Sequence, residues 1–366
     1  MSIDKVLITG SCGLVGSEAV WYFSNLGCEV VGIDNNHRRD WFGDAGDTTS
    51  IKSKLKELSN YRHMNLNIVD EYAMREVIGE EQPDLIIHAA GQPSHEKSSE
   101  IPLADFKVNA LGTINLLEAT RTLCPSAKFA FLSTNKVYGK SLGLKSKYVE
   151  IQEEEKRLHL RYMTQQDGRC KFYEEYSGIN EQCGIGNSEQ TPFGASKAAA
   201  DLMVQEYNSY FALTAACFRC GCITGRNHQG VEQHGFLSYL CKCAKSGKEY
   251  TIYGHKGKQV RDNIHAYDLV RAIHEWAKKP RSCVFNMGGG FNNSCSILEA
   301  IDTIKEKTNI DVNLKRDEKR NIQVAPGRKL DHLVYYTDLK KFKAFYQNWE
   351  ITRNLDSIFE ELLQDD

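Results

Sequence analysis

KVLITGSCGLVGSEAV, residues 5–20, joins a short apolar run to a helical pattern through three glycines. The run Lys5–Thr9 predicts a buried strand, and the apolar spacing of Leu14–Leu26 predicts a helix that ends at Gly27. The glycines between them are Gly10, Gly13 and Gly16. Glycines placed there permit a tight turn and bring backbone N–H groups to a pyrophosphate at the start of a helix. The stretch therefore predicts a dinucleotide-binding loop.

The same alternation of strand and helix patterns continues along the chain. Further strand-type runs lie at Glu29–Asp34, Asp84–Ala90 and Lys128–Ser133, and further helical patterns at Leu111–Leu123 and Pro192–Phe211. Strands that are apolar throughout belong to parallel sheets covered by helices on both faces. We therefore expect an α/β fold with a doubly wound parallel sheet of the Rossmann type.

Two domains are expected from the length and from a change of pattern. Residues 1–190 form the dinucleotide-binding domain, interrupted near 140–189 by a charged, aromatic-rich insertion for which we expect short helices. Residues 191–366 form mostly a smaller mixed α/β domain, although the helix and strand of 193–220 return to the core of the first domain. The amphipathic pattern of Asn354–Leu363 predicts a helix near the end of the chain.

Composition excludes several classes of protein. Of the 366 residues, 41% are apolar and 26% charged, which is typical of a globular chain, and the net charge of −2 gives no basic surface for nucleic acid or an anionic membrane. No apolar run is long enough to span a membrane, and no leader pattern precedes the first strand, so we expect a cytoplasmic protein. The 12 cysteines lack zinc-site spacing, which favours reduced thiols and no metal.

An acidic residue selects the form of the dinucleotide. Asp34 follows Gly16 by 18 residues, at the end of the second strand, where a carboxylate accepts hydrogen bonds from the adenosine ribose. A carboxylate there repels a 2′-phosphate, so NAD is expected. Arg38 and Arg39 are the counter-signal for NADP, and the alternative for them is a solvated loop.

Seven motifs carry a resemblance to a known family. They are TGSCGLVG (9–16), HAAGQ (88–92), NALGTINLLEA (109–119), STNKVYG (133–139), FGASKAAAD (193–201), GKQVRDNIH (257–265) and FNMGGG (285–290). The chain resembles the extended short-chain dehydrogenase/reductases that act on nucleotide sugars, and its subgroup of CDP-tyvelose (CDP-paratose) 2-epimerases in particular. The resemblance implies NAD on the first domain and a nucleotide sugar on the second. It implies transient oxidation of a sugar hydroxyl, with C2 epimerisation of a CDP-sugar favoured.

The resemblance also implies a catalytic set with one departure. The family uses a Ser or Thr, a Tyr, and a Lys four residues after the Tyr, and here Thr134 and Lys197 match while Phe193 replaces the tyrosine. A phenol near a lysine ammonium is the expected base, so Phe193 removes a general acid–base group. Three explanations stay open: an engineered Tyr→Phe trap, a natural Phe with another group moving the proton, and a silent binding protein. Candidates for such a group are Lys136, His228, His234 and the cysteines of residues 218–222.

Further roles follow residue by residue from the matched motifs. The implied cofactor contacts, besides the three glycines, Asp34, Arg38 and Lys197, are Leu14, Val15, Asn35, Asn67, Ile68, Ala89, Ala90, Gln92 and Asn109. The implied substrate contacts are Thr134, Asn135, Lys136, Asn227, His228, Arg261 and Arg328. The two arginines suit a diphosphate because a guanidinium gives bidentate contacts, and the alternative for both is an ion pair with Asp262 or Asp331.

The resemblance limits the reaction and suggests an assembly. Dehydratases of the family follow the Thr with Asp-Glu, whereas this chain has Asn135-Lys136, which disfavours loss of water. The alternatives that remain are a C4 epimerase, an oxidoreductase on another nucleotide sugar, and a catalytically silent binding protein. Helices near 104–122 and 194–211 pair two copies in many relatives, so a homodimer is expected.

Overall fold

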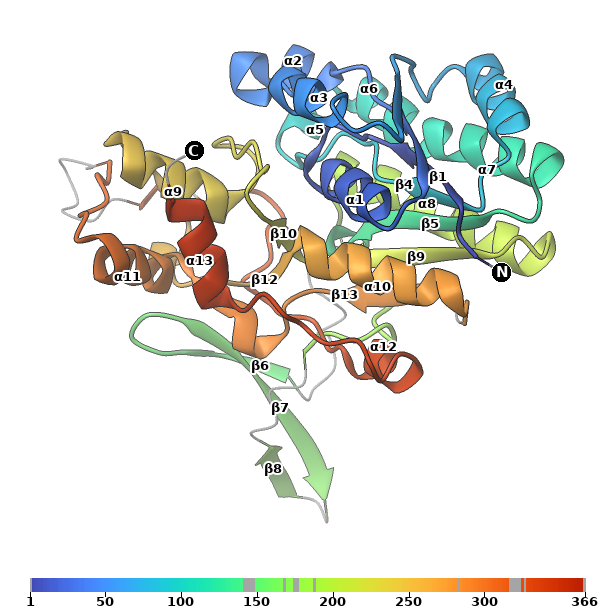
Figure 1. Ribbon diagram of the computed structural model, residues 1–366. Helices are drawn as coiled ribbons and strands as arrows, with labels where there is room; N and C mark the ends of the chain where they lie inside the picture. The colour runs from blue at the N-terminus through green and yellow to red at the C-terminus, as the bar shows by residue number, and fades with distance from the viewer. Residues whose placement is uncertain are drawn as a thin grey trace.

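A seven-stranded parallel sheet and the helices that cover it form the larger of two units in the molecule (Figure 1). The computed structural model describes residues 2–140, 149–166, 169–173, 178–186, 189–281, 284–315, 324–325 and 327–364. In spatial order the strands are β13 (Val284–Met287), β9 (Ala215–Cys220), β5 (Lys128–Thr134), β4 (Leu85–His88), β1 (Lys5–Thr9), β2 (Glu29–Ile33) and β3 (Tyr61–Met64). This confirms the doubly wound Rossmann sheet predicted from the sequence.

Helices cover both faces of this sheet because its strands are apolar on both faces. The helices α1 (Leu14–Asn25) and α10 (Ala266–Lys278) pack together on one face, where Val6 and Ile8 of β1 are fully buried. The helices α4 (Glu71–Glu81), α7 (Gly112–Leu123) and α8 (Pro192–Tyr210) cover the other face, toward which Leu7 points. Alternate residues of one strand thus reach two separate cores.

Two segments of the first 110 residues carry helices beside the carboxyl ends of the strands. The polar stretch after β2 forms α2 (His37–Phe42) and α3 (Thr49–Leu55). The stretch after β4 forms α5 (Lys97–Glu100), α6 (Pro102–Phe106) and a π-helical turn, η2 (Lys107–Leu111), that leads into α7. The strand β3 between these stretches was not predicted, since Tyr61–Met64 alternates without an apolar run.

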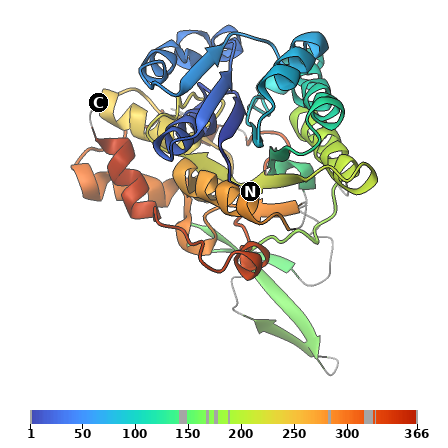
Figure 2. The same ribbon diagram turned by 45° about the vertical axis from the view of Figure 1, so that its right-hand side comes forward.

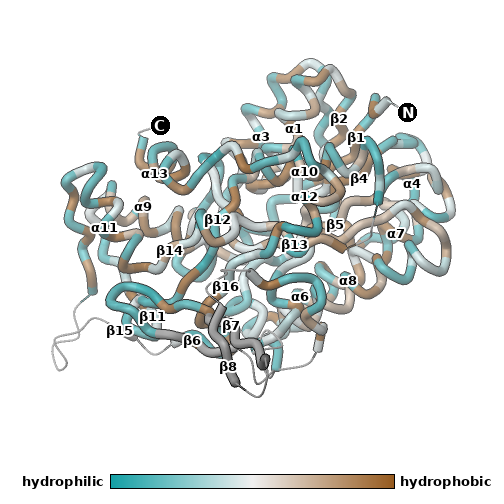
Figure 3. The backbone as a smooth tube through the Cα atoms, turned by 90° about the horizontal axis from the view of Figure 1, so that it is seen from below, coloured by the Kyte–Doolittle hydropathy of each residue, from teal (hydrophilic) through white to brown (hydrophobic). Residues whose placement is uncertain are grey.

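A smaller mixed unit is built from the second half of the chain. Its sheet contains β10 (Cys222–Thr224), β12 (Val260–His265), β14 (Ser294–Ser296) and β16 (Val334–Tyr335), and β11 (Ile252–Tyr253) pairs separately with β15 (Val324–Ala325). The helices α9 (Phe236–Ser246), α11 (Ile297–Thr308) and α13 (Leu355–Leu363) enclose a separate core, and α12 (Lys340–Phe345) returns beside β13. Figure 3 shows α9, α11 and α13 at one end of the molecule and β1, β2 and β4 at the other.

One of the passages of the chain between the two units is a single glycine. The strand β9 ends at Cys220 and β10 begins at Cys222, so Gly221 is the single residue between these strands of the large and the small sheet. A Cβ on Gly221 would stand 2.5 Å from Oδ1 of Asp262, which leaves no room for a side chain. The large sheet also contains β13 (residues 284–287). We expected the helix and strand of 193–220 to return to the core of the first domain, but not this later strand.

The insertion near 140–189 differs from the expectation. We expected short helices, but its described residues include the antiparallel strands β6 (Val149–Glu153), β7 (Leu158–Gln166) and β8 (Arg169–Tyr173). Figure 2 shows β7 and β8 extending away from the body of the molecule. Leu158 and Leu160, where β7 begins, are buried against Tyr335 and Tyr336, so packing on the second unit fixes the strand.

Among the described helices, none is long and apolar enough to cross a membrane.

Candidate active site

The glycine loop lies at the carboxyl end of β1 and leads directly into α1. Gly10 has φ of +69°, and a Cβ there would stand 2.7 Å from the backbone nitrogen of Ala90. A Cβ on Gly16 would stand 2.0 Å from the carbonyl oxygen of Gly10. Gly13 caps α1 without a side-chain hydrogen bond, and the first turn of α1 contains no acidic side chain. The backbone N–H groups of that turn are therefore available to an anion. These features fit a dinucleotide pyrophosphate at the start of α1.

Asp34 is held in place by the same loop. Its carboxylate accepts hydrogen bonds from the backbone N–H of Cys12 at 2.9 Å and of Asn36 at 2.8 Å. Asn35 beside it lines the cavity, and its side chain accepts from the backbone N–H of His37 at 3.3 Å. The carboxylate is thus fixed at the end of β2, where a ribose hydroxyl can reach it.

The remaining predicted cofactor contacts form two walls. Asn67 and Ile68 follow β3, and Ala89 and Ala90 follow β4 at the edge facing the glycine loop. Gln92 also lines the cavity. The Asn109 side chain lies behind this wall: its Oδ1 accepts from the N–H of Gln92 at 2.9 Å, and its Nδ2 donates to Asp105 at 3.1 Å. Asn109 is thus placed to fix Gln92 and does not line the cavity.

The three predicted catalytic positions lie at one corner of the cavity. Thr134 is the last residue of β5, and its Cα partner on β9 is Cys220. Phe193 and Lys197 stand one turn apart in α8, and both side chains are buried. Nζ of Lys197 donates to the carbonyl oxygen of Leu132 at 2.6 Å and lies 4.1 Å from the Phe131 ring centroid. Burial lowers the pKa of Lys197 to about 8.

A partly buried ion-pair network stands next to that corner. Nζ of Lys136 lies 2.6 Å from Oδ1 of Asp331, and Nη2 of Arg261 lies 2.8 Å from the same oxygen. The Arg261 guanidinium also donates to the carbonyl oxygens of Val260 and His332. Burial opposes ionisation of Asp331, but Arg261 and Lys136 hold the pKa of its carboxyl well below the usual range. The ion pair considered for Arg261 therefore exists, inside the cavity.

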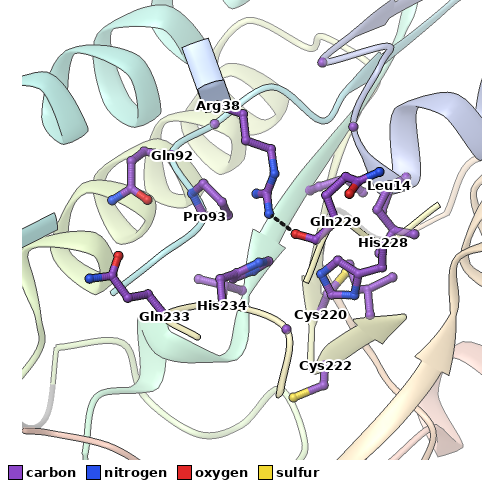
Figure 4. Close-up of a pocket in the computed structure, with 18 of the residues that line it drawn as sticks. Leu14, Arg38, Gln92, Pro93, Cys220, Cys222, His228, Gln229, Gln233 and His234 are labelled. Carbon is purple, nitrogen blue, oxygen red and sulfur yellow. Dashed lines mark hydrogen bonds between the residues drawn. The ribbon is translucent and has the colours of Figure 1, made fainter. Parts of the chain in front are cut away.

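A loop between β10 and α9 closes one side of the cavity (Figure 4). Arg38 donates to the carbonyl oxygen of Gln229 at 2.6 Å, and Ser94 donates to that of Gln233 at 3.2 Å. The rings of His228 and His234 lie 5.5 Å apart in an edge-on arrangement. Burial lowers the pKa of His228 to about 3 and that of His234 well below its usual value, so both are neutral at pH 7.

Arg328 lines the cavity and contacts the same loop. Its Nε lies 3.0 Å from Oε1 of Glu96, and its guanidinium carbon lies 4.8 Å from the ring centroid of Tyr253. It also donates to the carbonyl oxygen of Glu232 in the loop before α9. The ion pair considered for Arg328 with Asp262 or Asp331 is therefore made with Glu96.

One cavity of about 430 Å³ gathers almost every predicted site residue. It runs from the glycine loop past Thr134 and Phe193 to Arg261, Arg328 and Asn227, and of the predicted residues only Asn109 is not in its lining. The cavity is also lined by four residues that we did not predict as contacts from the sequence: His95, Asp331, Glu232 and Tyr253. Asp331 follows Arg328 by three residues, and that spacing was its only signal.

No metal centre is formed by the described part of the chain. Within those residues no group of three His, Cys, Asp or Glu side chains could hold a metal ion. The ten cysteines whose side chains are described are free thiols.

Comparison with known proteins agrees with the fold and with the expected family. The sequence profile of the NAD dependent epimerase/dehydratase family matches residues 6–163 and 169–288. CDP-paratose 2-epimerase of Salmonella typhi is 30% identical over 349 residues, which are 92% of each chain. UDP-glucose 4-epimerase of Mycoplasma genitalium is 24% identical over 98% of this chain and 94% of its own. The structure of Thermus thermophilus UDP-glucose 4-epimerase with NAD superposes with a TM-score of 0.73 at 22% identity, over 98% of this chain and 97% of that one.

A parallel sheet with a glycine loop and an acidic residue after β2 defines a dinucleotide-binding α/β protein. The chain belongs to the NAD-dependent epimerase/dehydratase family, as the sequence motifs predicted. Its cofactor is NAD, which the glycine loop, the helix terminus and Asp34 fit.

Proposed function

We propose that this protein epimerises a nucleotide-linked sugar by transient oxidation to a keto sugar, at C2 of a CDP-sugar. The observation that supports this most directly is the single cavity, which joins the dinucleotide loop to Thr134, Lys197 and Arg261. Its relative at 30% identity is a CDP-paratose 2-epimerase. The proposed substrate is therefore CDP-paratose and the product CDP-tyvelose.

The proposal assigns a role to four side chains of the cavity. When bound, NAD accepts the hydride of the sugar carbon and returns it. Lys197 holds the nicotinamide ribose, and the Thr134 hydroxyl bonds the sugar oxygen that becomes the carbonyl. Arg261 and Arg328 bind the diphosphate, which leaves the sugar free to turn between the two hydride transfers.

Asn135 argues for epimerisation rather than dehydration. Its side chain is buried at the cavity wall, and Oδ1 accepts a hydrogen bond from Thr134 at 3.4 Å. A neutral amide cannot protonate a leaving hydroxyl as a carboxylic acid does. Elimination of water from the sugar is therefore not expected.

Product analysis tests the proposal. The purified protein with CDP-paratose should give a mixture with CDP-tyvelose in the NMR spectrum, and rapid mixing should show transient absorbance of NADH. Denatured protein should release NAD and not NADP, because Asp34 repels a 2′-phosphate. Conversion of a UDP-sugar at C4, with no change in CDP-paratose, would replace this function by the C4 alternative. Binding of both ligands without any hydride transfer would identify a silent binding protein, the outcome that Phe193 keeps open.

We also propose a homodimer. Six large apolar side chains are exposed on the neighbouring elements α6, η2 and α8 and directly after α8: Leu103, Phe106, Leu111, Leu202, Tyr210 and Phe211. Exposed apolar groups gathered on adjacent helices mark a protein interface. A second copy of this chain is the proposed partner, and a cytoplasmic location stays a prediction.

A further inference from the structure

Phe193 has no group that can take up a proton, yet the proposed oxidation releases one from the sugar hydroxyl. We infer that Lys136 is the catalytic acid–base group of this protein, with Asp331 as its positioning partner. The inference rests on the proposed function, because a proton must be moved only if the sugar is oxidised. It selects Lys136 from the four kinds of candidate that the sequence left open, and gives Asp331 a role that the sequence did not suggest.

The backbone of Lys136 is fixed at the catalytic corner. Its N–H donates to Oγ1 of Thr134 at 3.2 Å, which caps the turn η3 (Asn135–Tyr138). Its carbonyl oxygen lies 2.9 Å from the position that a Cβ on Gly194 would take, so it lies against the residue after Phe193. The Lys136 side chain therefore leaves the backbone beside Thr134 and Gly194, and it lines the same cavity as Phe193.

The amine of Lys136 can give up its proton without leaving Asp331 unpaired. Asp331 Oδ1 pairs with Lys136 at 2.6 Å and with Arg261 at 2.8 Å. A guanidinium stays charged at all relevant pH values, so Arg261 still compensates the carboxylate when Lys136 is neutral. A buried carboxylate with a single partner would instead resist that deprotonation.

Lys197 also lies at this corner, but its Nζ donates to the carbonyl oxygen of Leu132 at 2.6 Å, and the proposed function assigns it to the nicotinamide ribose. The thiols and imidazoles near the corner suit the task less well. Burial raises the pKa of the Cys220 and Cys222 thiols to about 12, away from neutrality. Burial lowers the pKa of His95 and of His228 to about 3, which makes both imidazoles weak bases. Burial lowers the pKa of Lys136 below its usual value although Asp331 opposes this shift, and a lower pKa favours the neutral amine that can accept a proton. The groups that act on this ammonium are Asp331, Arg261, Cys222, His95 and His332.

Lys136 alone can accept and return the proton that the two hydride transfers require. As hydride leaves the sugar carbon for the nicotinamide, the hydroxyl proton passes to the neutral Lys136 amine, and a carbonyl and an ammonium form. After the sugar turns, hydride returns to the opposite face of the same carbon, and the ammonium gives its proton back to the oxygen. The amine is then neutral again, and no external oxidant is consumed.

Two variants of the NAD-loaded protein test the inference. Lys136→Met should lower turnover of CDP-paratose at least ~10²-fold, the low end for a positioned acid–base group. Added methylamine should restore part of that turnover, which a loss of positioning alone would not allow. Lys136→Arg keeps a cation beside Asp331 but cannot deprotonate, so it should be equally slow and insensitive to methylamine. Both variants should retain NAD, and this shows that they are folded.

A matched control and a second readout complete the test. Lys258 forms a similar pair with Glu153 at 2.7 Å, with 17% of its side chain exposed against 15% for Lys136, but lies outside the cavity lining. Lys258→Met should turn over as the wild type does. Acetylation of the wild type by acetic anhydride, read by mass spectrometry, should modify Lys136 increasingly as pH rises, and CDP-paratose should protect it.

The possible failures are distinct. A wild type that turns over no nucleotide sugar overturns the proposed function, and the inference falls with it. An active wild type together with an active Lys136→Met or Lys136→Arg protein overturns the inference alone. Labelling of Lys136 that CDP-paratose does not slow would also overturn it, because the amine would then not contact the sugar.

Discussion

Phe193 and Lys197 lie one helical turn apart on α8, and both side chains are buried in the wall of the same cavity. A phenol at position 193 would therefore share this wall with the Lys197 ammonium and the Thr134 hydroxyl at the end of β5. The phenyl ring keeps the shape of that arrangement and removes its proton-transfer group. In the proposed function, the site therefore lacks the phenol that the family resemblance led us to expect.

Phe193→Tyr tests what that loss means. Because Phe and Tyr have nearly the same shape, the variant should keep its fold and its NAD. If Lys136 moves the proton, turnover of CDP-paratose should change by less than about tenfold, since a second base adds little. NMR of the sugar nucleotide measures the rate. A rise of ~10²-fold or more would instead identify Phe193 as a trap that had removed the working base.

Arg261→Ala should separate binding of the two ligands. Loss of a charge-assisted hydrogen-bond pair to a diphosphate costs about 2–3 kcal/mol, or roughly a hundredfold in the dissociation constant of the nucleotide sugar. NAD binding should change little, because Arg261 lies on β12 in the smaller unit. Isothermal titration with CDP-paratose and with NAD measures both. Arg271→Ala, which removes an ion pair to Asp268 outside the cavity lining, is the control. Equal weakening of both ligands would contradict the assignment.

Gly16→Ala should disturb the dinucleotide loop. The added Cβ would stand 2.0 Å from the carbonyl oxygen of Gly10, so backbone has to move. We expect loss of bound NAD and a decrease of about 1–3 kcal/mol in the free energy of unfolding, as for other overpacked sites. Gly79→Ala is the matched control, because its Cβ would make an ordinary 3.5 Å contact with Leu123. Urea unfolding and NAD content measure the effect, and an NAD-loaded Gly16→Ala protein of unchanged stability would refute it.

Lys197 should make stability depend on pH above neutrality. Burial lowers its pKa from 10.5 to about 8, so between these values the unfolded chain holds more protons than the folded chain. The free energy of unfolding contributed by Lys197 therefore rises with pH across that window, by about 1 kcal/mol per pH unit at most. The difference between wild type and Lys197→Met, measured by urea unfolding of NAD-free protein, should shift accordingly. A difference that stays constant with pH would show that Lys197 is charged in the fold.

Leu202→Glu should convert the proposed dimer to a monomer. Leu202 is 49% exposed on α8, and a charge in an apolar interface has to be desolvated. Light scattering after gel filtration gives the mass. Tyr72→Glu is the control, because Tyr72 is 77% exposed and belongs to α4, a helix that packs on α7. A wild type that is already monomeric, or a Leu202→Glu dimer, would contradict the interface.

The sequence by itself determined the features that depend on neighbours along the chain. The strand Lys5–Thr9, the glycine loop and the helix that follows are contiguous, so apolar spacing and three glycines were enough to predict them. The helix α8 with Phe193 and Lys197 follows from the same kind of pattern. Insertion strands β6–β8 were missed, because their charged residues show no period and packing on the second unit holds β7.

Only the tertiary structure decided which charges meet. Lys136 and Asp331 lie 195 residues apart in sequence, and the ion pair exists because residues 327–335 return beside β12, where β16 pairs with it. Tertiary contacts also pair Arg328 with Glu96 and bring the Asn109 side chain to the backbone N–H of Gln92. A pairing of this kind depends on burial and on the distance between two units, neither of which is encoded in the spacing of residues along the chain.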